Sequence, residues 1–327
     1  MAKNAYFFVF PTNTPSSSYF TSLEMATKEE EVLHEFHFFR VYKDGRLQMF
    51  RPQVEKIPPY DDPVTGVRSK DVVISTDPPV SARIFLPNIT DPNRKLPVLL
   101  YVHGGGFCMM SAFSAVFHNF VSTVVAQANV IAVSVEYGLF PDRPIPACYE
   151  DSWAALQWIA SHAGRNGSDP WLNEYADFHR VFVAGDSAGG NITHTLVSRV
   201  GKLGLLGVKV VGAILVHPIF GGTKDDYMWL YMCPENRGLD DPRMKPTAED
   251  LAKLGCERVL LFAAENDHLF NSGRNYITEL KKSRWVGSSE LVENLGLEHC
   301  FHLIKPHQEE EKTRELIHKF VSFIKQD

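Results

Sequence analysis

The pentapeptide Gly185-Asp186-Ser187-Ala188-Gly189 carries the strongest chemical signal in this sequence. It directly follows the apolar run 180–184, which predicts a strand, and it precedes a helix-like pattern that begins near Asn191. A sharp turn from strand to helix needs glycines on both sides and presents the turning residue near a helix N-terminus, where negative charge is stabilised. The same letters occur in plain Gly-Ser loops, but this position favours Ser187 as a nucleophile.

A second glycine-rich segment, His103-Gly104-Gly105-Gly106-Phe107, directly follows the apolar run that ends at Val102. Attack on an acyl group forms a tetrahedral oxyanion, and each backbone N–H aimed at that charge is worth about 10²–10³ in rate. We assign the donors to Gly105, Gly106 and Ala188. A phosphate-binding glycine loop is the alternative, and it is less favoured because no Gly-Lys-Ser/Thr follows.

A serine nucleophile needs a base and an acid, and when the serine lies on such a turn both follow it in the chain, acid first. Asp267 lies just beyond the strand-like run 259–264, at the end where the strands of a parallel sheet carry functional residues. Glu265 lies nearer to the strand and competes for this role, and Asp267 would also suit a helix N-cap. We favour Asp267 as the acid.

The base must come from the histidines that follow Asp267. His299 comes after a short strand-like run, 290–293, and a loop, so it can reach back over the sheet. His302, three residues further on, is the competing candidate. His268 is expected to face solvent or the core. We therefore predict His299 as the base.

Apolar strand-like runs alternate with amphipathic helix-like stretches along most of the chain. These runs are apolar on both faces, which is typical of a parallel sheet with helices on each side. The predicted fold class is therefore α/β with a largely parallel sheet.

The N-terminal part follows a different pattern. From Val32 the helical spacing of apolar residues predicts a helix, followed by a strand at 39–42 and a hairpin turn at 43–46. Residues about 220–254 interrupt the strand rhythm with an insertion rich in Trp, Tyr, Met and Pro. The predicted organisation is a disordered or targeting extension at 1–24 and a single domain at 25–327, whose cap consists of 25–50 and about 220–254.

Composition argues against several classes of function. The formal net charge is −6 and the 33 Lys and Arg are scattered, so a nucleic-acid partner is not expected. The five cysteines are widely spaced and form no Cys-x-x-Cys pair, which favours free thiols in a reducing compartment. No apolar run approaches the roughly 20 residues of a membrane span. We expect a cytoplasmic protein without metal or cofactor, although the extension at 1–24 leaves organelle targeting open; the sequence does not define the oligomeric state.

Four motifs together resemble the plant carboxylesterases of the hormone-sensitive-lipase group, a branch of the α/β-hydrolases that includes the gibberellin receptors. They are His103-Gly-Gly-Gly-Phe107, Gly185-Asp-Ser-Ala-Gly-Gly-Asn191, Asp267-His-Leu-Phe-Asn-Ser-Gly273 and Glu298-His-Cys-Phe-His302. The likeness runs from about Met25 to the C-terminus. It implies an α/β-hydrolase fold, ester hydrolysis through an acyl-enzyme, and a triad of Ser187, Asp267 and His299.

One loop departs from the pattern of that family. The family usually reads Glu-Tyr-Arg-Leu-Ala-Pro-Glu, whereas this chain reads Glu136-Tyr-Gly-Leu-Phe-Pro-Asp142. Gly138 replaces the arginine and Phe140 replaces the alanine. We therefore expect an internal ion pair to be absent and the loop to be reshaped.

The resemblance also implies rival functions. A receptor that binds its hormone without turnover has no need of a base, so His299 argues against that function. Dehydratases or cyclases of plant specialised metabolism are the second hypothesis, because they resemble the esterases closely. For an esterase we expect a small or medium apolar ester as substrate, held by the cap together with Phe107, Asp186 and Trp229.

Overall fold

An eight-stranded sheet forms the centre of the computed structural model, which describes residues 31–50, 54–304 and 309–326. The strand order is β11-β10-β9-β8-β6-β7-β5-β4. Strand β5 pairs antiparallel with β4 and β7, and the other described pairs in this sheet are parallel, which confirms the α/β class with a largely parallel sheet. The strands are β4 (Arg68–Thr76), β5 (Pro79–Leu86), β6 (Leu96–Val102), β7 (Ile131–Glu136), β8 (Ala176–Asp186), β9 (Val210–Val216), β10 (Arg258–Ala264) and β11 (Ser288–Asn294).

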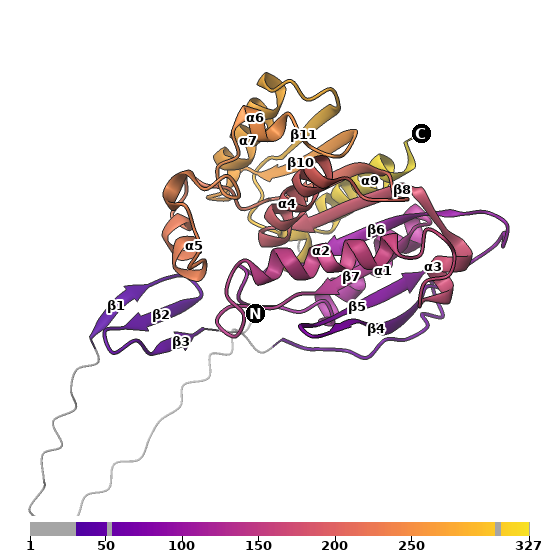
Figure 1. Ribbon diagram of the computed structural model, residues 1–327, viewed down its shortest axis with the longest axis horizontal. Coiled ribbons are helices and arrows are strands. Elements are labelled where there is room, and N and C mark those ends of the chain that lie inside the picture. Colours follow the sequence, from indigo (N-terminus) through magenta and orange to yellow (C-terminus); the bar gives the residue numbers. More distant parts are fainter. Residues whose placement is uncertain (1–30, 51–53, 305–308, 327) are drawn as a thin grey trace, which may run out of the picture.

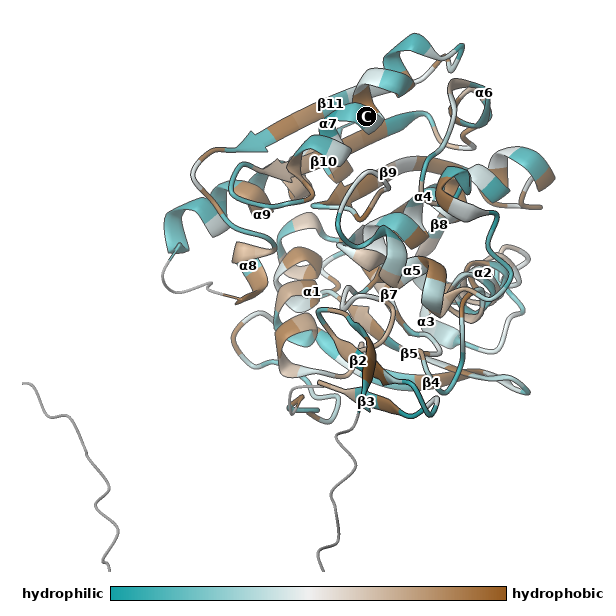
Figure 2. Cartoon of the chain, turned by 90° about the vertical axis from the view of Figure 1, so that its left-hand side faces the viewer, coloured by the Kyte–Doolittle hydropathy of each residue, from teal (hydrophilic) through white to brown (hydrophobic). Residues whose placement is uncertain are grey.

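Helices cover both faces of this sheet (Figure 1). Successive side chains of a strand point to opposite faces, and in β6 Leu100 packs in the apolar layer with α2 and α4 while Leu99 packs in the layer with α1 and α9. Figure 2 shows the largely apolar α1 in brown. The helices are α1 (Ala115–Ala128), α2 (Ala147–Ala160), α3 (Pro170–Tyr175), α4 (Ala188–Leu203), α7 (Phe270–Lys282), α8 (Phe301–Ile304) and α9 (Glu310–Lys325).

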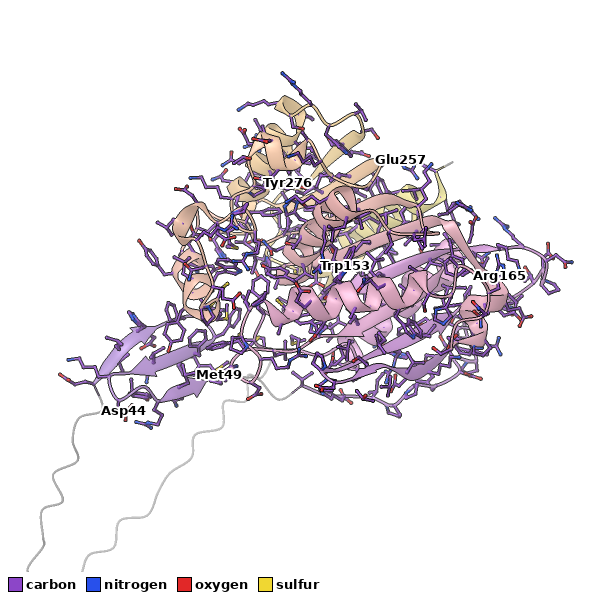
Figure 3. The ribbon with its side chains drawn as sticks, viewed as in Figure 1. Asp44, Met49, Trp153, Arg165, Glu257 and Tyr276 are labelled. Carbon is purple, nitrogen blue, oxygen red and sulfur yellow. The ribbon has the colours of Figure 1, made fainter. Side chains whose placement is uncertain are left out.

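A small three-stranded sheet at the N-terminal end of the described chain stands apart from the main sheet, beside α5 (Figure 1). Its strands pair in the order β1-β2-β3. In Figure 3, Asp44 marks the outer turn of this hairpin and Met49 lies at its inner end. These elements and the insertion, which we together call the cap, are β1 (Val32–Glu35), β2 (Phe39–Tyr42), β3 (Leu47–Met49), α5 (Asp226–Met232), the 3₁₀ helix η1 (Gly238–Asp240) and α6 (Ala248–Leu251).

The helix predicted from Val32 is wrong, because residues 32–35 form strand β1. This strand pairs antiparallel with β2, and the Arg40 guanidinium donates to both carboxylate oxygens of Glu35 across the pair, at 3.0 and 3.1 Å. A helix this short is marginal in water, whereas strand pairing satisfies its backbone groups. The predicted strand at 39–42 and turn at 43–46 are confirmed, and the extension at 1–24 lies outside the described residues.

The expected loss of an internal ion pair at Gly138 is also wrong. Arg143 supplies the guanidinium, and its Nη1 and Nη2 lie 2.5 and 2.9 Å from the carboxylate oxygens of the buried Asp151. A Cβ on Gly138 would lie 2.7 Å from Arg143 Cδ, so Arg143 occupies the space that a side chain at 138 would need. An arginine five residues later thus supplies the guanidinium that position 138 lacks.

Two further predictions concern the cysteines and membrane-spanning segments. None of the five cysteines forms a disulfide, as the sequence predicted, and all five are buried. Among the described helices, none is long and apolar enough to cross a membrane.

Candidate active site

Ser187 lies at the sharp turn between β8 and α4. Its backbone has a positive φ of 52° and a ψ of −116°, which is a strained conformation for a residue with a side chain. Hydrogen bonds hold the turn, since Ser187 N–H donates to Val216 O at 2.8 Å and Ile219 N–H donates to Ser187 O at 3.0 Å. A Cβ on Gly189 would lie 2.0 Å from Val102 O, so the close crossing of β6 and α4 requires glycine there.

The structure brings the three predicted catalytic side chains together. His299 Nε2 lies 2.9 Å from Ser187 Oγ, and His299 Nδ1 lies 2.5 Å from Asp267 Oδ2. An ionised carboxylate only accepts hydrogen bonds, so the proton of the neutral imidazole is assigned to Nδ1 and the serine hydroxyl donates to Nε2. This order is the one that lets an imidazole remove the proton of a serine.

Asp267 is held in its ionised form. Burial alone would raise the pKa of its carboxyl, but the hydrogen bond and charge of His299 and the N–H of Leu269, which donates to Asp267 Oδ1 at 3.0 Å, together lower the pKa. The competing carboxylate, Glu265, is exposed and accepts a hydrogen bond from Gly296 N–H at 2.7 Å. The geometry therefore favours Asp267 over Glu265.

The two competing histidines occupy different surroundings. His302 is 3% exposed, neither of its ring nitrogens bonds to a described residue, and its ring packs edge-on against Phe120 at 5.2 Å. Burial lowers the pKa of His302 well below its usual value, so this imidazole stays neutral. His268 is exposed, which agrees with the prediction, and its Nε2 lies 2.6 Å from Asp225 Oδ2 at the start of α5.

The loop that carries His299 is anchored by His217, which the sequence did not indicate. Cys300 N–H donates to His217 Nδ1 at 2.9 Å, and His217 Nε2 lies 3.1 Å from Asn294 Oδ1. Burial, followed by the neighbouring His299, lowers the pKa of His217 to about 4. His217 directly follows β9, at the sheet edge where functional residues gather. That position is the sequence feature that could have identified His217.

The predicted oxyanion loop lies beside the turn of Ser187. Gly105 and Gly106 have positive φ values of 113° and 59°, which glycine adopts readily. In the described part of the chain, their N–H groups donate to no protein acceptor. Ala188 is the first residue of α4, so its N–H has no acceptor within the helix. All three assigned donors are therefore available to a bound anion.

Asp186 fixes the position of this loop through a hydrogen bond. Its Oδ1 accepts hydrogen bonds from Tyr101 Oη at 2.7 Å and from Gly104 N–H at 3.1 Å. A Cβ on Gly104 would lie 2.3 Å from Asp186 Oδ2, so the contact requires glycine. Burial raises the pKa of Asp186 to about 6, against the hydrogen bond from Tyr101. These contacts favour positioning of the loop over direct contact with substrate.

The other residues assigned to the pocket are also enclosed. Phe107 is 1% exposed, and its carbonyl accepts a hydrogen bond from Phe140 N–H at 3.0 Å. Trp229 is also 1% exposed and donates from Nε1 to Tyr149 Oη at 3.3 Å, which favours a packing role in α5. Phe38, which the sequence did not single out, lies against the oxyanion loop, because a Cβ on Gly106 would lie 2.2 Å from its Cε2.

One group in the described chain has the donor types of a metal site. The ligand atoms of His217, His299 and Cys300 lie within 4.8 Å of one another. Both nitrogens of His217 and both nitrogens of His299 are already engaged in the hydrogen bonds given above. Burial also raises the pKa of the Cys300 thiol well above its usual value, which disfavours the thiolate that binds metal. The donor set therefore fits hydrogen bonding better than metal binding.

Similarities to known proteins agree with this geometry. Residues 99–303 match the Abhydrolase_3 family, described as an alpha/beta hydrolase fold. The chain is 39% identical to 2-hydroxyisoflavanone dehydratase of Glycyrrhiza echinata, over 87% of this chain and 93% of that protein. It is 40% identical to Probable carboxylesterase 1 of Arabidopsis thaliana, over 88% and 96%. A solved Pyrobaculum calidifontis esterase is 26% identical with a TM-score of 0.64, covering 79% of this chain and 84% of that chain. The chain therefore belongs to the α/β-hydrolase family, in the branch of the plant carboxylesterases.

Proposed function

We propose that this protein is a serine carboxylesterase. The hydrogen-bonded series from Ser187 Oγ through His299 to Asp267 carries this proposal, because it activates a hydroxyl for attack on an acyl carbon. The relatives named carboxylesterase and esterase support the same chemistry. The substrate class is a small or medium apolar carboxylic ester, which is supported by the aromatic ring of Phe38 from the cap beside Gly106 of the oxyanion loop.

The reaction follows from the geometry in two halves. Ser187 Oγ attacks the ester carbonyl while His299 Nε2 takes its proton, and Asp267 stabilises the imidazolium that forms. The N–H groups of Gly105, Gly106 and Ala188 bind the oxyanion. The intermediate then collapses, and the departing alcohol takes the proton back from His299.

Water completes the cycle. His299 removes a proton from a water molecule, which attacks the acyl-enzyme carbonyl, and the same three N–H groups bind the second oxyanion. Collapse releases the carboxylic acid and returns the proton to Ser187. No step requires a group beyond the residues named.

Turnover of p-nitrophenyl acetate and butyrate tests the proposal. We expect Ser187→Ala to lose at least about 10³-fold in kcat/KM, because the nucleophile is removed. Ser198→Ala is a matched control, since Ser198 is another buried serine on α4, and it should retain wild-type turnover. Equal activity of Ser187→Ala and wild type would overturn the assignment.

A dehydratase is the second candidate function, favoured by the 39% identity to 2-hydroxyisoflavanone dehydratase. The same His299 would then remove a proton from the substrate, and no acyl group would be transferred to Ser187. Mixing the protein with 2-hydroxyisoflavanone and following the loss of water by mass spectrometry distinguishes the two functions. Dehydration without ester hydrolysis would favour this candidate.

We place the protein in the cytoplasm. None of its five cysteines forms a disulfide, which supports a reducing compartment. Probable carboxylesterase 4 of Arabidopsis thaliana, 40% identical, is named mitochondrial. Imaging of the full chain with a C-terminal fluorescent fusion tests the location, and a mitochondrial signal would contradict it.

A further inference from the structure

Four aromatic rings join three segments that are distant in the sequence, and we call this cluster the aromatic clamp. Phe36 and Phe39 come from the N-terminal hairpin, Phe140 from the loop after β7, and Tyr231 from α5. The ring of Phe39 lies 5.1 Å from that of Phe140 and 5.7 Å from that of Tyr231. Phe140 and Tyr231 meet at 6.1 Å in an edge-on arrangement. These centroid distances are those of favourable aromatic pairs.

The clamp is connected directly to the oxyanion loop. Phe140 N–H donates to Phe107 O at 3.0 Å, so the loop after β7 and the oxyanion loop are fixed to each other. The hairpin residue before Phe39 is Phe38, whose ring lies where a side chain on Gly106 would be, 2.2 Å from its Cβ position. Closing the clamp therefore places the hairpin over the loop that would bind the oxyanion.

Apolar side chains, including those of the clamp, attach the hairpin to the body. All four residues of β1 are exposed. The described polar contacts of the hairpin, such as Glu35 with Arg40 and Tyr42 with Gln48, stay inside it. Phe39, by contrast, is fully buried and Phe140 is 5% exposed. Apolar burial therefore opposes lifting of the hairpin, and the clamp contributes to it together with Val41, Leu47 and Met49, which also pack against the core.

The hairpin limits the space at the oxyanion loop, because the ring of Phe38 lies against Gly106. Ser187 is 7% exposed and the side chain of His299 beside it is 30% exposed. A lid held by packed apolar side chains opens less often, and to a smaller extent, than a loosely packed one. Phe140 replaces the alanine that the family pattern carries at this position, so this chain has an additional ring at the meeting point of all three segments.

We propose that Phe140 is a specificity-determining residue, which holds the hairpin closed over the oxyanion loop and limits the size of ester that the site admits. The proposal rests on the esterase function proposed above. Small acyl groups fit beneath the closed hairpin, whereas longer ones require the clamp to open. Phe140→Ala restores the family residue and removes the ring without changing any group that touches the reacting atoms.

The test compares p-nitrophenyl acetate with p-nitrophenyl octanoate. In Phe140→Ala we expect the ratio of kcat/KM for octanoate to that for acetate to rise on the order of tenfold, the scale on which pocket contacts discriminate chain length. Tyr231→Ala should shift the ratio in the same direction, because it removes a second ring of the clamp. Tyr227→Ala is the matched control on the same helix, where the side chain is 66% exposed, and the ratio should not change.

Hydrogen exchange provides a readout that does not depend on turnover. Backbone amides of β2 should exchange faster in Phe140→Ala and Tyr231→Ala than in wild type or Tyr227→Ala. Tyr231 is 36% exposed, so its replacement tests the clamp even if Phe140→Ala fails to fold. A folded variant with unchanged chain-length preference and unchanged β2 exchange overturns the proposal. If wild type does not hydrolyse p-nitrophenyl acetate but β2 still exchanges faster in the two variants, the esterase function is refuted. The role of the clamp in holding the hairpin is then still supported.

Discussion

Replacing Arg143 with alanine tests how this chain compensates for Gly138. The carboxylate of Asp151 is 1% exposed and accepts two hydrogen bonds from Arg143 and one from Gly138 N–H. Breaking a buried ion pair by removing one partner costs about 3–5 kcal/mol. The Arg143 side chain is 26% exposed, so solvent reduces the expected cost to about 2–3 kcal/mol.

This loss converts into a measurable change in thermal stability. For a chain of 327 residues the entropy of unfolding is about 0.7 kcal/mol/K, so Tm should fall by about 3–4 °C. Arg199→Ala is the control, because Arg199 pairs with Glu150 at the surface, with 31% and 56% of the side chains exposed. That surface pair should contribute no more than about 1 kcal/mol.

A second substitution tests the geometry itself. Adding Gly138→Arg to Arg143→Ala should recover at least half of the lost stability, because the space now filled by Arg143 becomes free and the new guanidinium starts beside Asp151. The assay is urea unfolding followed by circular dichroism. A loss no larger than that of Arg199→Ala, or a double variant less stable than Arg143→Ala, would refute the reasoning.

Three further predictions concern the active site. His217→Ala should lower kcat by up to about 10²-fold with little change in KM, since the loop of His299 loses its anchor; an unchanged kcat would contradict this role. His302→Phe should fold and keep wild-type kcat, whereas inactivity in a folded variant would favour His302 as the base. Burial raises the pKa of Asp186 from 3.8 to about 6, so its contribution to stability is present below about pH 4 and is lost as the pH rises through about 6. Asp186→Asn should therefore remove up to about 3 kcal/mol of that pH dependence in urea unfolding, and parallel pH profiles of the two proteins would count against it.

Much of the candidate site could be predicted because its signals are local. The glycines around Ser187 and the strand before it specify the turn, and chain order then limits where an acid and a base can lie. The same chain-order rule hid His217, because it confined the search to residues after the acid. His217 acts through a hydrogen bond to Cys300, and no local pattern reports such a contact.

The remaining features depend on contacts between distant segments. The ring of Phe38 fills the space beside Gly106, and a sequence pattern does not show which side chain lies there. Arg143 lies five residues after Gly138 and pairs with Asp151 in place of the missing arginine. A comparison of position 138 alone with the family pattern therefore predicts that the ion pair is lost. Residues 32–35 have helical spacing, yet pairing with β2 decides their structure.

The central claim is that Ser187 forms a covalent acyl-enzyme. Rapid acid quenching of the protein with p-nitrophenyl butyrate, followed by peptide mapping with mass spectrometry, measures this directly. For wild type we predict one butyryl group on the peptide that contains Ser187. In Ser187→Ala this signal should fall to background. In His299→Ala the butyryl group should accumulate only slowly, because the base is absent. Ester turnover by wild type without acylation of Ser187, or with acylation of another residue, would contradict the claim.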